Sequence, residues 1–142
     1  MDLAHGVPTG FELLEPNNPY WETFGPVYRN TDRHVLGFTV QRHHCNPVGS
    51  LHGGAISTFA DMQLMAAPGY TGKLEAHAPT ISLTVDYIAT CQMGDWVEAE
   101  VSVDRVTRRL LFSRAMISAG GRLIARSTAL YRNHDKTGYP LT

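Results

Sequence analysis

The sequence of 142 residues has little net charge, few cysteines and no long hydrophobic run, and each shortage argues against a class of protein. Its formal net charge of −1 disfavours nucleic-acid binding, because contacts with phosphates normally require an excess of basic residues. No apolar segment approaches the roughly 18 residues of a membrane-spanning helix, so no membrane partner is expected. No linker of biased composition divides the chain, and residues 1–142 are interpreted as a single domain.

The beginning of the chain and its cysteines bear on its compartment. Residues 1–6 have neither the basic nor the apolar region of a signal peptide, and the two cysteines, Cys45 and Cys91, lack the spacing of a disulfide framework. Reduced thiols are typical of intracellular proteins, so we expect a cytoplasmic location. Cys45 follows two histidines, but no Cys-x-x-Cys or His-x-x-x-His pattern accompanies it, and no metal site is expected.

The most informative segment is apolar from about Gly54 to Ala67 and stops at Pro68-Gly69, which predicts a buried helix. Asp61 carries the only charge in this segment. An unpaired buried carboxylate is costly, so Asp61 either has a function or lies on a wet strip of the helix with Ser57 and Thr58. Helix chemistry alone leaves both interpretations open.

The start of this predicted helix lacks a conventional side-chain cap, since no Ser, Thr, Asp or Asn directly precedes Gly53-Gly54. Two glycines let a ligand approach the first backbone N–H groups, which carry the positive end of the helix dipole. Such donors can stabilise negative charge on a carbonyl oxygen, as in an oxyanion hole.

Most of the remaining chain shows the two-residue alternation of strands that have one wet face. Residues 1–24 are rich in Pro, Asn and Gly and are interpreted as a packed arm with one short helix. One helix with a run of antiparallel strands predicts an α+β protein whose sheet wraps around the helix. Such a sheet has two edges to protect, so at least a homodimer is expected. The expected strands are a hairpin over 25–28 and 35–42 with its turn at 30–32, and four further strands over 81–87, 97–103, 110–118 and 123–131.

The entry into the central helix resembles a known family. The pattern Asn46-x-x-Gly-x-x-His52-Gly53-Gly54-Ala, with Asp61 seven residues after the second glycine, is similar to the signature of hotdog-fold acyl-CoA thioesterases and most similar to their phenylacetate-pathway (PaaI-like) subgroup. This resemblance implies the hotdog fold, an antiparallel sheet wrapped around one long central helix. It also implies a homodimer or a dimer of dimers, in which two sheets join edge to edge and active sites form at the dimer interface. Further similar segments are Gly25-Pro26, Thr80 to Tyr87, Gly94-Asp95 and Leu123 to Ala125.

The resemblance implies roles for single residues as well. It predicts hydrolysis of an acyl-CoA thioester to the acid and coenzyme A, with Asp61 as general base or nucleophile and the Gly53 N–H polarising the carbonyl. Asn46 and His52 match residues that line this carbonyl, and Thr80 matches a hydroxyl that holds the attacking water. As alternatives, Asn46 is a turn residue and His52 is a helix-entry residue bonded to the backbone.

Coenzyme A carries phosphates, which need donors or cations. We assign Arg108 and Arg109, together with Gly54, to substrate binding, although exposed hairpin arginines also serve solubility alone. Because coenzyme A is part of the substrate, no cofactor is expected. The basic cluster expected on the sheet consists of Arg105, Arg108, Arg109 and Arg114.

Two other functions remain open. A hotdog dehydratase or hydratase would need a differently placed histidine or an Asp–His pair, whereas a non-catalytic acyl-CoA binding protein would have no use for a carboxylate beside a thioester. A serine hydrolase is disfavoured, because no Gly-x-Ser-x-Gly motif occurs and Ser57 lies inside the predicted helix. The acyl group is not determined by the sequence, since its pocket would be shaped by a partner chain and by Phe59, Met62, Met65 and Ala66.

Overall fold

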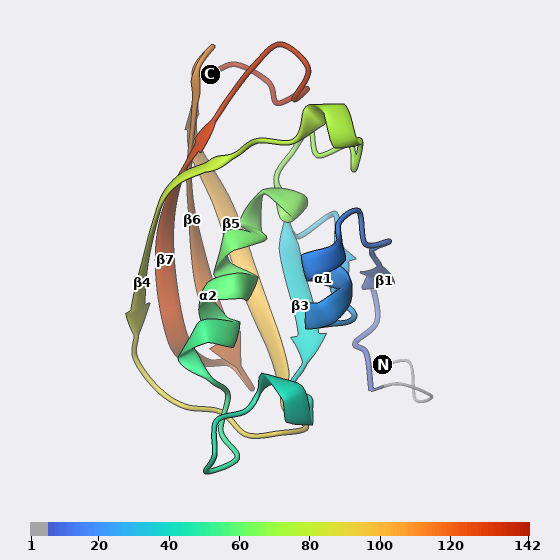
Figure 1. Ribbon diagram of the computed structural model, residues 1–142, viewed down its shortest axis with the longest axis vertical. Coiled ribbons are helices and arrows are strands. Elements are labelled where there is room, and N and C mark those ends of the chain that lie inside the picture. The colour runs from blue at the N-terminus through green and yellow to red at the C-terminus, as the bar shows by residue number, and fades with distance from the viewer. Residues whose placement is uncertain (1–5) are drawn as a thin grey trace.

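The computed structural model of the protein describes residues 6–142 and contains a seven-stranded sheet that curves around helix α2 (Figure 1). This is the predicted α+β hotdog arrangement. Residues 1–5 lie outside the described residues. They include most of the segment that was assessed as a signal peptide and the beginning of the predicted 1–24 arm. The helices are α1 (Pro19–Phe24) and α2 (Gly53–Asp61), and the strands are β1 (Glu12–Leu13), β2 (Tyr28–Asn30), β3 (Val35–Thr39), β4 (Thr80–Tyr87), β5 (Trp96–Val106), β6 (Leu110–Ala119) and β7 (Arg122–Arg132).

The strand order places β4 at an edge of the sheet. The order is β1-β2-β3-β5-β6-β7-β4, and all the pairings are antiparallel. After α2 the chain therefore crosses to the far side and adds β4 beside β7, where Thr80 pairs with Tyr131. This crossover brings the first residue of β4 to the end of α2, so the topology itself assembles residues that are distant in sequence.

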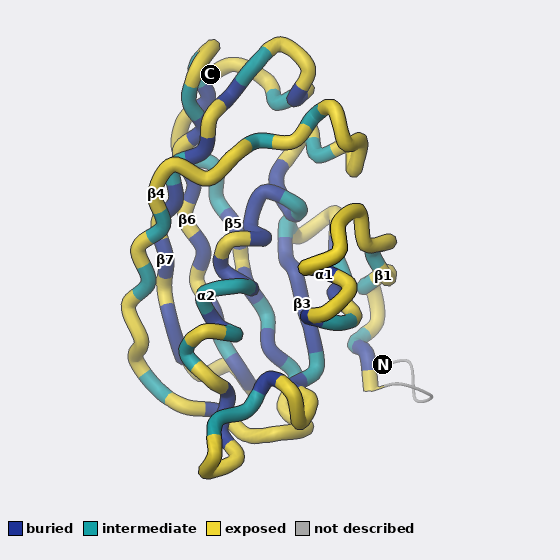
Figure 2. The backbone as a smooth tube through the Cα atoms, viewed as in Figure 1, coloured by how far each residue is buried: buried dark blue, intermediate teal, exposed yellow. Residues whose placement is uncertain are grey.

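The core lies between α2 and the inner face of the sheet. Phe59 of α2 and Phe38 of β3 are both fully buried, and their ring centroids lie 4.6 Å apart. Burying a side chain of this size stabilises the fold by roughly 1.5–3 kcal/mol. Figure 2 shows buried and exposed residues alternating along β6 and β7, whereas β4 is mostly exposed. The predicted single wet face is thus confirmed for the inner strands.

The central helix is shorter than predicted. Regular α-helix ends at Asp61, and a separate 3-10 turn, η2 (Gln63–Ala66), continues toward Ala67. At this end, two main-chain carbonyl oxygens accept hydrogen bonds from side chains. Gln63 donates to Ala60 O (2.8 Å), and Tyr131 donates to Asp61 O (3.1 Å). Asp61, placed in the middle of the predicted helix, is instead the last residue of α2, and it is exposed in the single chain, which corresponds to the wet-strip alternative of the sequence analysis.

The first hairpin also differs from its predicted bounds. Gly25 does not begin a strand but ends α1, with a φ of 106° that favours glycine and with its N–H bonded to Trp21 O (3.0 Å). The strand β2 therefore starts at Tyr28, and β3 ends at Thr39. The short helix expected in the arm is confirmed as α1, whereas β1 was not predicted.

Two further expectations concern the chain as a whole. Cys45 and Cys91 are free cysteines. Within residues 6–142, no helix is long and apolar enough to cross a membrane.

Candidate active site

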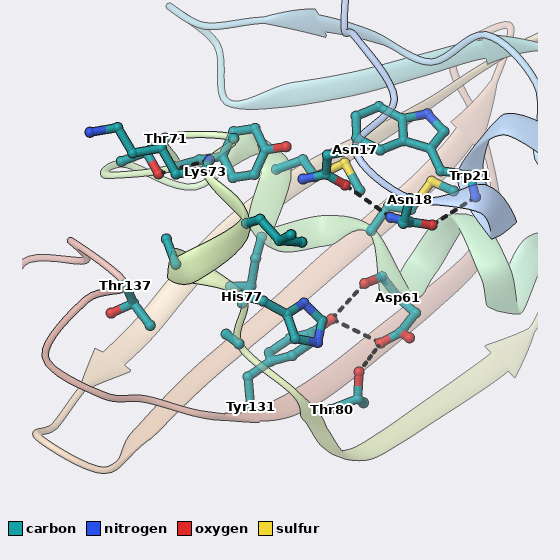
Figure 3. A pocket seen from close by; sticks show the side chains of 18 of the residues that line it. Asn17, Asn18, Trp21, Asp61, Thr71, Lys73, His77, Thr80, Tyr131 and Thr137 are labelled. Atoms are coloured by element: carbon teal, nitrogen blue, oxygen red, sulfur yellow. Dashed lines mark hydrogen bonds between the residues drawn. The ribbon is translucent and has the colours of Figure 1, made fainter.

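Asp61 lies in the wall of a cavity of about 430 Å³ (Figure 3). The end of α2 and the turn η2 form one side of this cavity, and the start of β4 and the end of β7 form another. Met62 and Met65 line it as expected, but Phe59 and Ala66 do not, because both are fully buried in the core. The exposed lining is mostly apolar, and it includes the Asp61 carboxylate and polar side chains such as Lys73 and His77.

The Asp61 carboxylate is held by two hydroxyl groups. Thr80 Oγ1 donates to Asp61 Oδ1 at 2.8 Å, and Tyr131 Oη donates to the same oxygen at 3.2 Å. Thr80 begins β4 and Tyr131 lies near the end of β7, and the two residues are cross-strand partners. Three elements of the fold therefore meet at one side-chain oxygen.

Tyr131 remains a hydrogen-bond donor over the physiological pH range. Its side chain is buried, with 2% of its surface exposed. Burial raises the pKa of Tyr131 well above its usual value, and the negative charge of the neighbouring Asp61 raises it further. The hydroxyl therefore keeps its proton and can donate a hydrogen bond to the Asp61 carboxylate.

The start of α2 is capped by a side chain, which corresponds to the backbone-bonded role that the sequence analysis gave His52 as its alternative. The Gly54 N–H donates to Nδ1 of His52 (2.8 Å), which makes His52 the N-cap residue. Because Nδ1 accepts this bond, the neutral imidazole carries its proton on Nε2, where it can act as a donor. Gly54 thus lacks a free amide, whereas the Gly53 N–H donates to no residue that the structure describes.

Both glycines at this helix start are closely packed. A Cβ atom on Gly54 would lie 3.0 Å from Nδ1 of His52, and one on Gly53 would lie 3.3 Å from Cε1 of Tyr87. Tyr87 Oη also donates to Gly53 O (3.2 Å) and is hydrogen-bonded to Ser57 Oγ. Tyr87, at the end of β4, therefore fastens the first turn of α2 to the edge strand.

Asn46 is engaged within its own loop. Its Oδ1 accepts the N–H groups of Val48 and Ser50 (both 3.1 Å), and its Nδ2 donates to Ser50 Oγ (2.7 Å). These bonds correspond to the turn role that the sequence analysis gave as the alternative. In the single chain, Asn46 shapes the loop that leads to His52.

The predicted site residues form two separate groups in one chain. Gly53 and Asp61 are the first and last residues of α2, so the helical rise of 1.5 Å per residue places their backbones about 12 Å apart. Asp61 and Thr80 meet at one end, while Gly53, Gly54 and His52 lie at the other. One copy of the chain does not bring the carboxylate to the free amide.

The arginines proposed for phosphate binding lie elsewhere. Arg108 and Arg109 line an open depression of about 650 Å³ at the turn between β5 and β6, together with Asp135. They are not among the residues that line the Asp61 cavity. Arg114 instead pairs with Asp104 (2.9 Å) on an exposed part of the sheet and does not line the depression that Arg108 and Arg109 share.

The sequence analysis missed several residues of the cavity. Tyr131 was predicted only as a strand residue, although the alternation of β7 with buried Ser127 and Ala129 would have placed it on the inner face. His77 and Lys73 come from the connection between α2 and β4, which carries no motif. Figure 3 shows the His77 imidazole directed into the cavity. Among residues 6–142, no group of three or more metal-ligating side chains is found.

Comparisons with known proteins identify related chains. A sequence model described as the thioesterase superfamily matches residues 48–125. A Pseudomonas aeruginosa protein that is named as an esterase is 30% identical over 128 residues, which cover 88% of this chain and 96% of that protein.

Two solved structures show the same fold. A mutant of the phenylacetic acid degradation protein PaaI from Thermus thermophilus has a TM-score of 0.61 at 22% identity, covering 87% of this chain and 93% of that one. A Streptococcus pneumoniae protein, described as a hypothetical thioesterase with coenzyme A, has a TM-score of 0.61 at 17% identity, covering 71% and 78%.

Proposed function

The chain belongs to the thioesterase superfamily, and from this premise we propose that it hydrolyses an acyl-coenzyme A thioester to the free acid and coenzyme A. The observation that carries the proposal is the Asp61 carboxylate, held by Thr80 in the wall of a cavity that is otherwise largely apolar. An apolar cavity suits an acyl chain, and a positioned carboxylate suits attack on the thioester.

We propose that the complete site needs a second copy of the chain. Because Gly53 and Asp61 lie at opposite ends of α2, a free amide reaches the carboxylate only if another subunit supplies it. The outer edge of β4 is the place for this contact, since Ile81 and Tyr87 are 51% and 55% exposed there and, among the described strands, β4 pairs only with β7. A two-fold axis beside β4 would create two equal sites in a homodimer, and a dimer of dimers would keep both.

In this assembly each end of α2 has a chemical role. The Gly53 N–H of one subunit and the positive end of its helix polarise the thioester carbonyl. Asp61 of the other subunit acts either as a general base for water or as the nucleophile. As a base, it takes a proton from water while the water oxygen bonds to the carbonyl carbon. The tetrahedral intermediate then expels the thiolate, which recovers that proton as the thiol.

The remaining assignments support this chemistry. His52 Nε2–H is a second donor for the carbonyl, and Asn46 holds the loop from which His52 projects. Thr80 uses its proton on Asp61, so only its oxygen lone pairs are free to hold the attacking water. Arg108 and Arg109 stay candidates for the coenzyme A phosphates. An acyl-CoA substrate and free cysteines also fit action in the cytoplasm.

One observation favours a second candidate function. His77 lines the same cavity as Asp61, and a histidine with a carboxylate can add water to an enoyl-CoA thioester. The hydratase reaction leaves the thioester intact, so it releases no coenzyme A. Following enoyl absorbance and thiol release in one assay separates the two functions.

The test of the proposed function is a hydrolysis screen with acyl-CoA thioesters that carry short, long and aromatic acyl groups. Free thiol is measured with a chromogenic disulfide, and Asp61→Asn serves as the matched inactive variant. Thiol release by the wild type but not by Asp61→Asn supports the proposal. Tight binding of an acyl-CoA without thiol release would instead identify a non-catalytic binding protein.

A further inference from the structure

We infer that Tyr131 is a positioning residue which, together with Thr80, occupies Oδ1 of Asp61 and thereby makes Oδ2 the reacting oxygen. This inference rests on the proposed thioesterase function and adds to it the atom that reacts and the residue that selects it. It follows from how the hydrogen bonds at Asp61 are distributed.

The two carboxylate oxygens of Asp61 have unequal surroundings. Oδ1 accepts from Thr80 Oγ1 at 2.8 Å and from Tyr131 Oη at 3.2 Å. A carboxylate oxygen offers about two lone-pair positions, so these two donors use the capacity of Oδ1. Oδ2 accepts no hydrogen bond from any residue in the described range 6–142, and only this oxygen has lone pairs left for water or a thioester carbon.

Tyr131 contacts both the side chain and the main chain of Asp61. Its hydroxyl lies 3.1 Å from the main-chain oxygen of Asp61, where α2 ends, and 3.2 Å from Oδ1 of the same residue. One proton is thus shared between the helix terminus and the carboxylate. The contact ties the orientation of the Asp61 side chain to the position of the helix end. Without it, a carboxylate on the last residue of a helix could rotate about its side-chain bonds.

The fold makes Tyr131 suitable for this purpose. It belongs to β7, which is paired on both sides, with β6 and with β4. Its side chain is almost fully buried, so packing restricts its rotation. Burial also raises the pKa of Tyr131, which keeps the proton on the donor. Thr80, by contrast, is exposed at the sheet edge, and the rigid member of the pair is Tyr131.

The assignment applies to both chemical routes. As a base, Oδ2 takes one proton from water and returns it to the departing thiolate. As a nucleophile, Oδ2 bonds to the acyl carbon while the carbon–sulfur bond breaks and coenzyme A leaves as the thiolate. Water then cleaves the anhydride to the free acid and regenerates the carboxylate, and the proton released from water goes to the thiolate. In either route the Oδ1 hydrogen bonds persist, so their role is orientation and not proton transfer.

The decisive experiment compares Tyr131→Phe, Asp61→Asn and the double variant, using the acyl-CoA that the wild type hydrolyses best. Tyr131→Phe keeps the ring and loses only the hydroxyl. We expect its kcat to fall roughly tenfold, as for the loss of one hydrogen bond to a charged group, while KM stays within about twofold. In the Asp61→Asn background, the same change should cause no further loss, because the group that Tyr131 positions is already inactive.

Ser113→Ala is the matched control for stability. Ser113 is also buried and loses one hydroxyl that donates within the core, to Gln63 Oε1 (2.6 Å), but it neither lines the cavity nor touches Asp61. Its melting temperature should fall about as much as that of Tyr131→Phe, with kcat unchanged. If Tyr131→Phe does not fold, Thr80→Val removes the other Oδ1 donor at an exposed position and should likewise lower kcat without raising KM.

The outcomes separate the two proposals. An equal loss from Tyr131→Phe in the wild-type and Asp61→Asn backgrounds, or a rise in KM with kcat unchanged, overturns the positioning role and leaves the thioesterase function standing. The same applies if Ser113→Ala lowers kcat as much as Tyr131→Phe does. A wild type that hydrolyses no thioester overturns the proposed function and this inference with it.

Discussion

Thr80 and Tyr131 face each other across strands β4 and β7, and their hydroxyl groups meet at one oxygen of the Asp61 carboxylate. The edge strand β4 therefore does two things at once. It supplies one of these hydroxyls from its first residue, and its last residue, Tyr87, holds the start of α2. A single pairing of β4 with β7 thus connects both ends of the helix to the sheet.

The first prediction concerns Asp61. Asp61→Asn should lower hydrolysis at least about a hundredfold, because a positioned general base contributes roughly 10²- to 10⁴-fold in rate and a nucleophile more. The fold should persist, since asparagine retains an oxygen that accepts from Thr80 and Tyr131. It also removes a negative charge from the last residue of a helix, where the dipole disfavours it.

The measurement pairs steady-state release of coenzyme A with thermal melts of both proteins. A well-folded Asp61→Asn protein with near-normal turnover would exclude Asp61 as the catalytic group. Turnover would then have to come from another cavity residue, with His77 as the first to test.

How far the sequence predicts this molecule depends on the range of the interactions involved. The strands over 110–118 and 123–131 were predicted nearly to their ends, because local alternation reports which face is buried. The end of α2 was not, because it depends on Tyr131, a residue brought there by the pairing of distant strands.

The two ends of the candidate site show the same limit. Gly53 was assigned correctly to the helix start, since two glycines before an apolar run are a local signal. The sequence analysis gave the backbone contact of His52 only as an alternative, because histidine is not a standard capping residue and its contact with the Gly54 N–H depends on the ring orientation. The alternation of β7 is a local signal that Tyr131 is buried, but it does not show what Tyr131 contacts, and His77 has no local signal, so their place in the cavity is visible only in the structure.

The second prediction isolates the amide at the helix start. Gly53 is the first residue of α2, a position where proline is well tolerated, and His52 before it has φ −68° and ψ 137°, as proline requires of its neighbour. Gly53→Pro should therefore keep the helix while it removes the N–H and adds the proline ring. Loss of one oxyanion-hole donor predicts a fall in kcat of about 10²- to 10³-fold.

Gly53→Ala is the control for steric effects. It adds a Cβ atom at the same position, 3.3 Å from the Tyr87 ring, but retains the N–H. Turnover and melting temperature are measured for both variants. Equal losses from the two substitutions would assign the effect to contact with Tyr87 and remove the amide from the mechanism.

The third prediction is a pH dependence of stability that comes from His44. This buried imidazole accepts the Gln41 N–H on Nδ1 (3.0 Å) and donates from Nε2 to Phe24 O (2.6 Å), so a second proton would break the first bond. Burial lowers the pKa of His44 below its usual value, and the neighbouring His43 lowers it further. The unfolded chain therefore binds the proton more readily, and the free energy of unfolding should fall as pH drops below about 6.5.

Urea unfolding at pH 7.5, 6.5 and 5.5 measures this loss, with His44→Leu as the comparison. The variant should be less stable at pH 7.5, because the Gln41 N–H loses its partner and Phe24 O keeps only its bond from His43 Nε2, but its stability should decline less toward pH 5.5. Parallel curves for the two proteins would show that the acid sensitivity arises from other groups.

The last prediction concerns the shared site. If each site combines Asp61 of one subunit with the Gly53 amide of another, then Asp61→Asn and Gly53→Pro damage opposite halves of it. A mixed dimer of these two variants would contain one doubly damaged site and one intact site. Random association produces about half mixed dimers. Two nearly inactive proteins should therefore recover about a quarter of wild-type turnover when they are co-expressed, or unfolded and refolded together.

The control is the same pair of proteins mixed after folding, in which recovery should follow the rate of subunit exchange. Ile81→Lys in both chains places charge on the exposed edge of β4 and should abolish recovery by preventing dimers, as light scattering would show. Dimers that form without any recovered activity would contradict a site shared between subunits. Since about 12 Å of helix separates Gly53 from Asp61 in one chain, the donors at the helix start would then have no role at the Asp61 carboxylate.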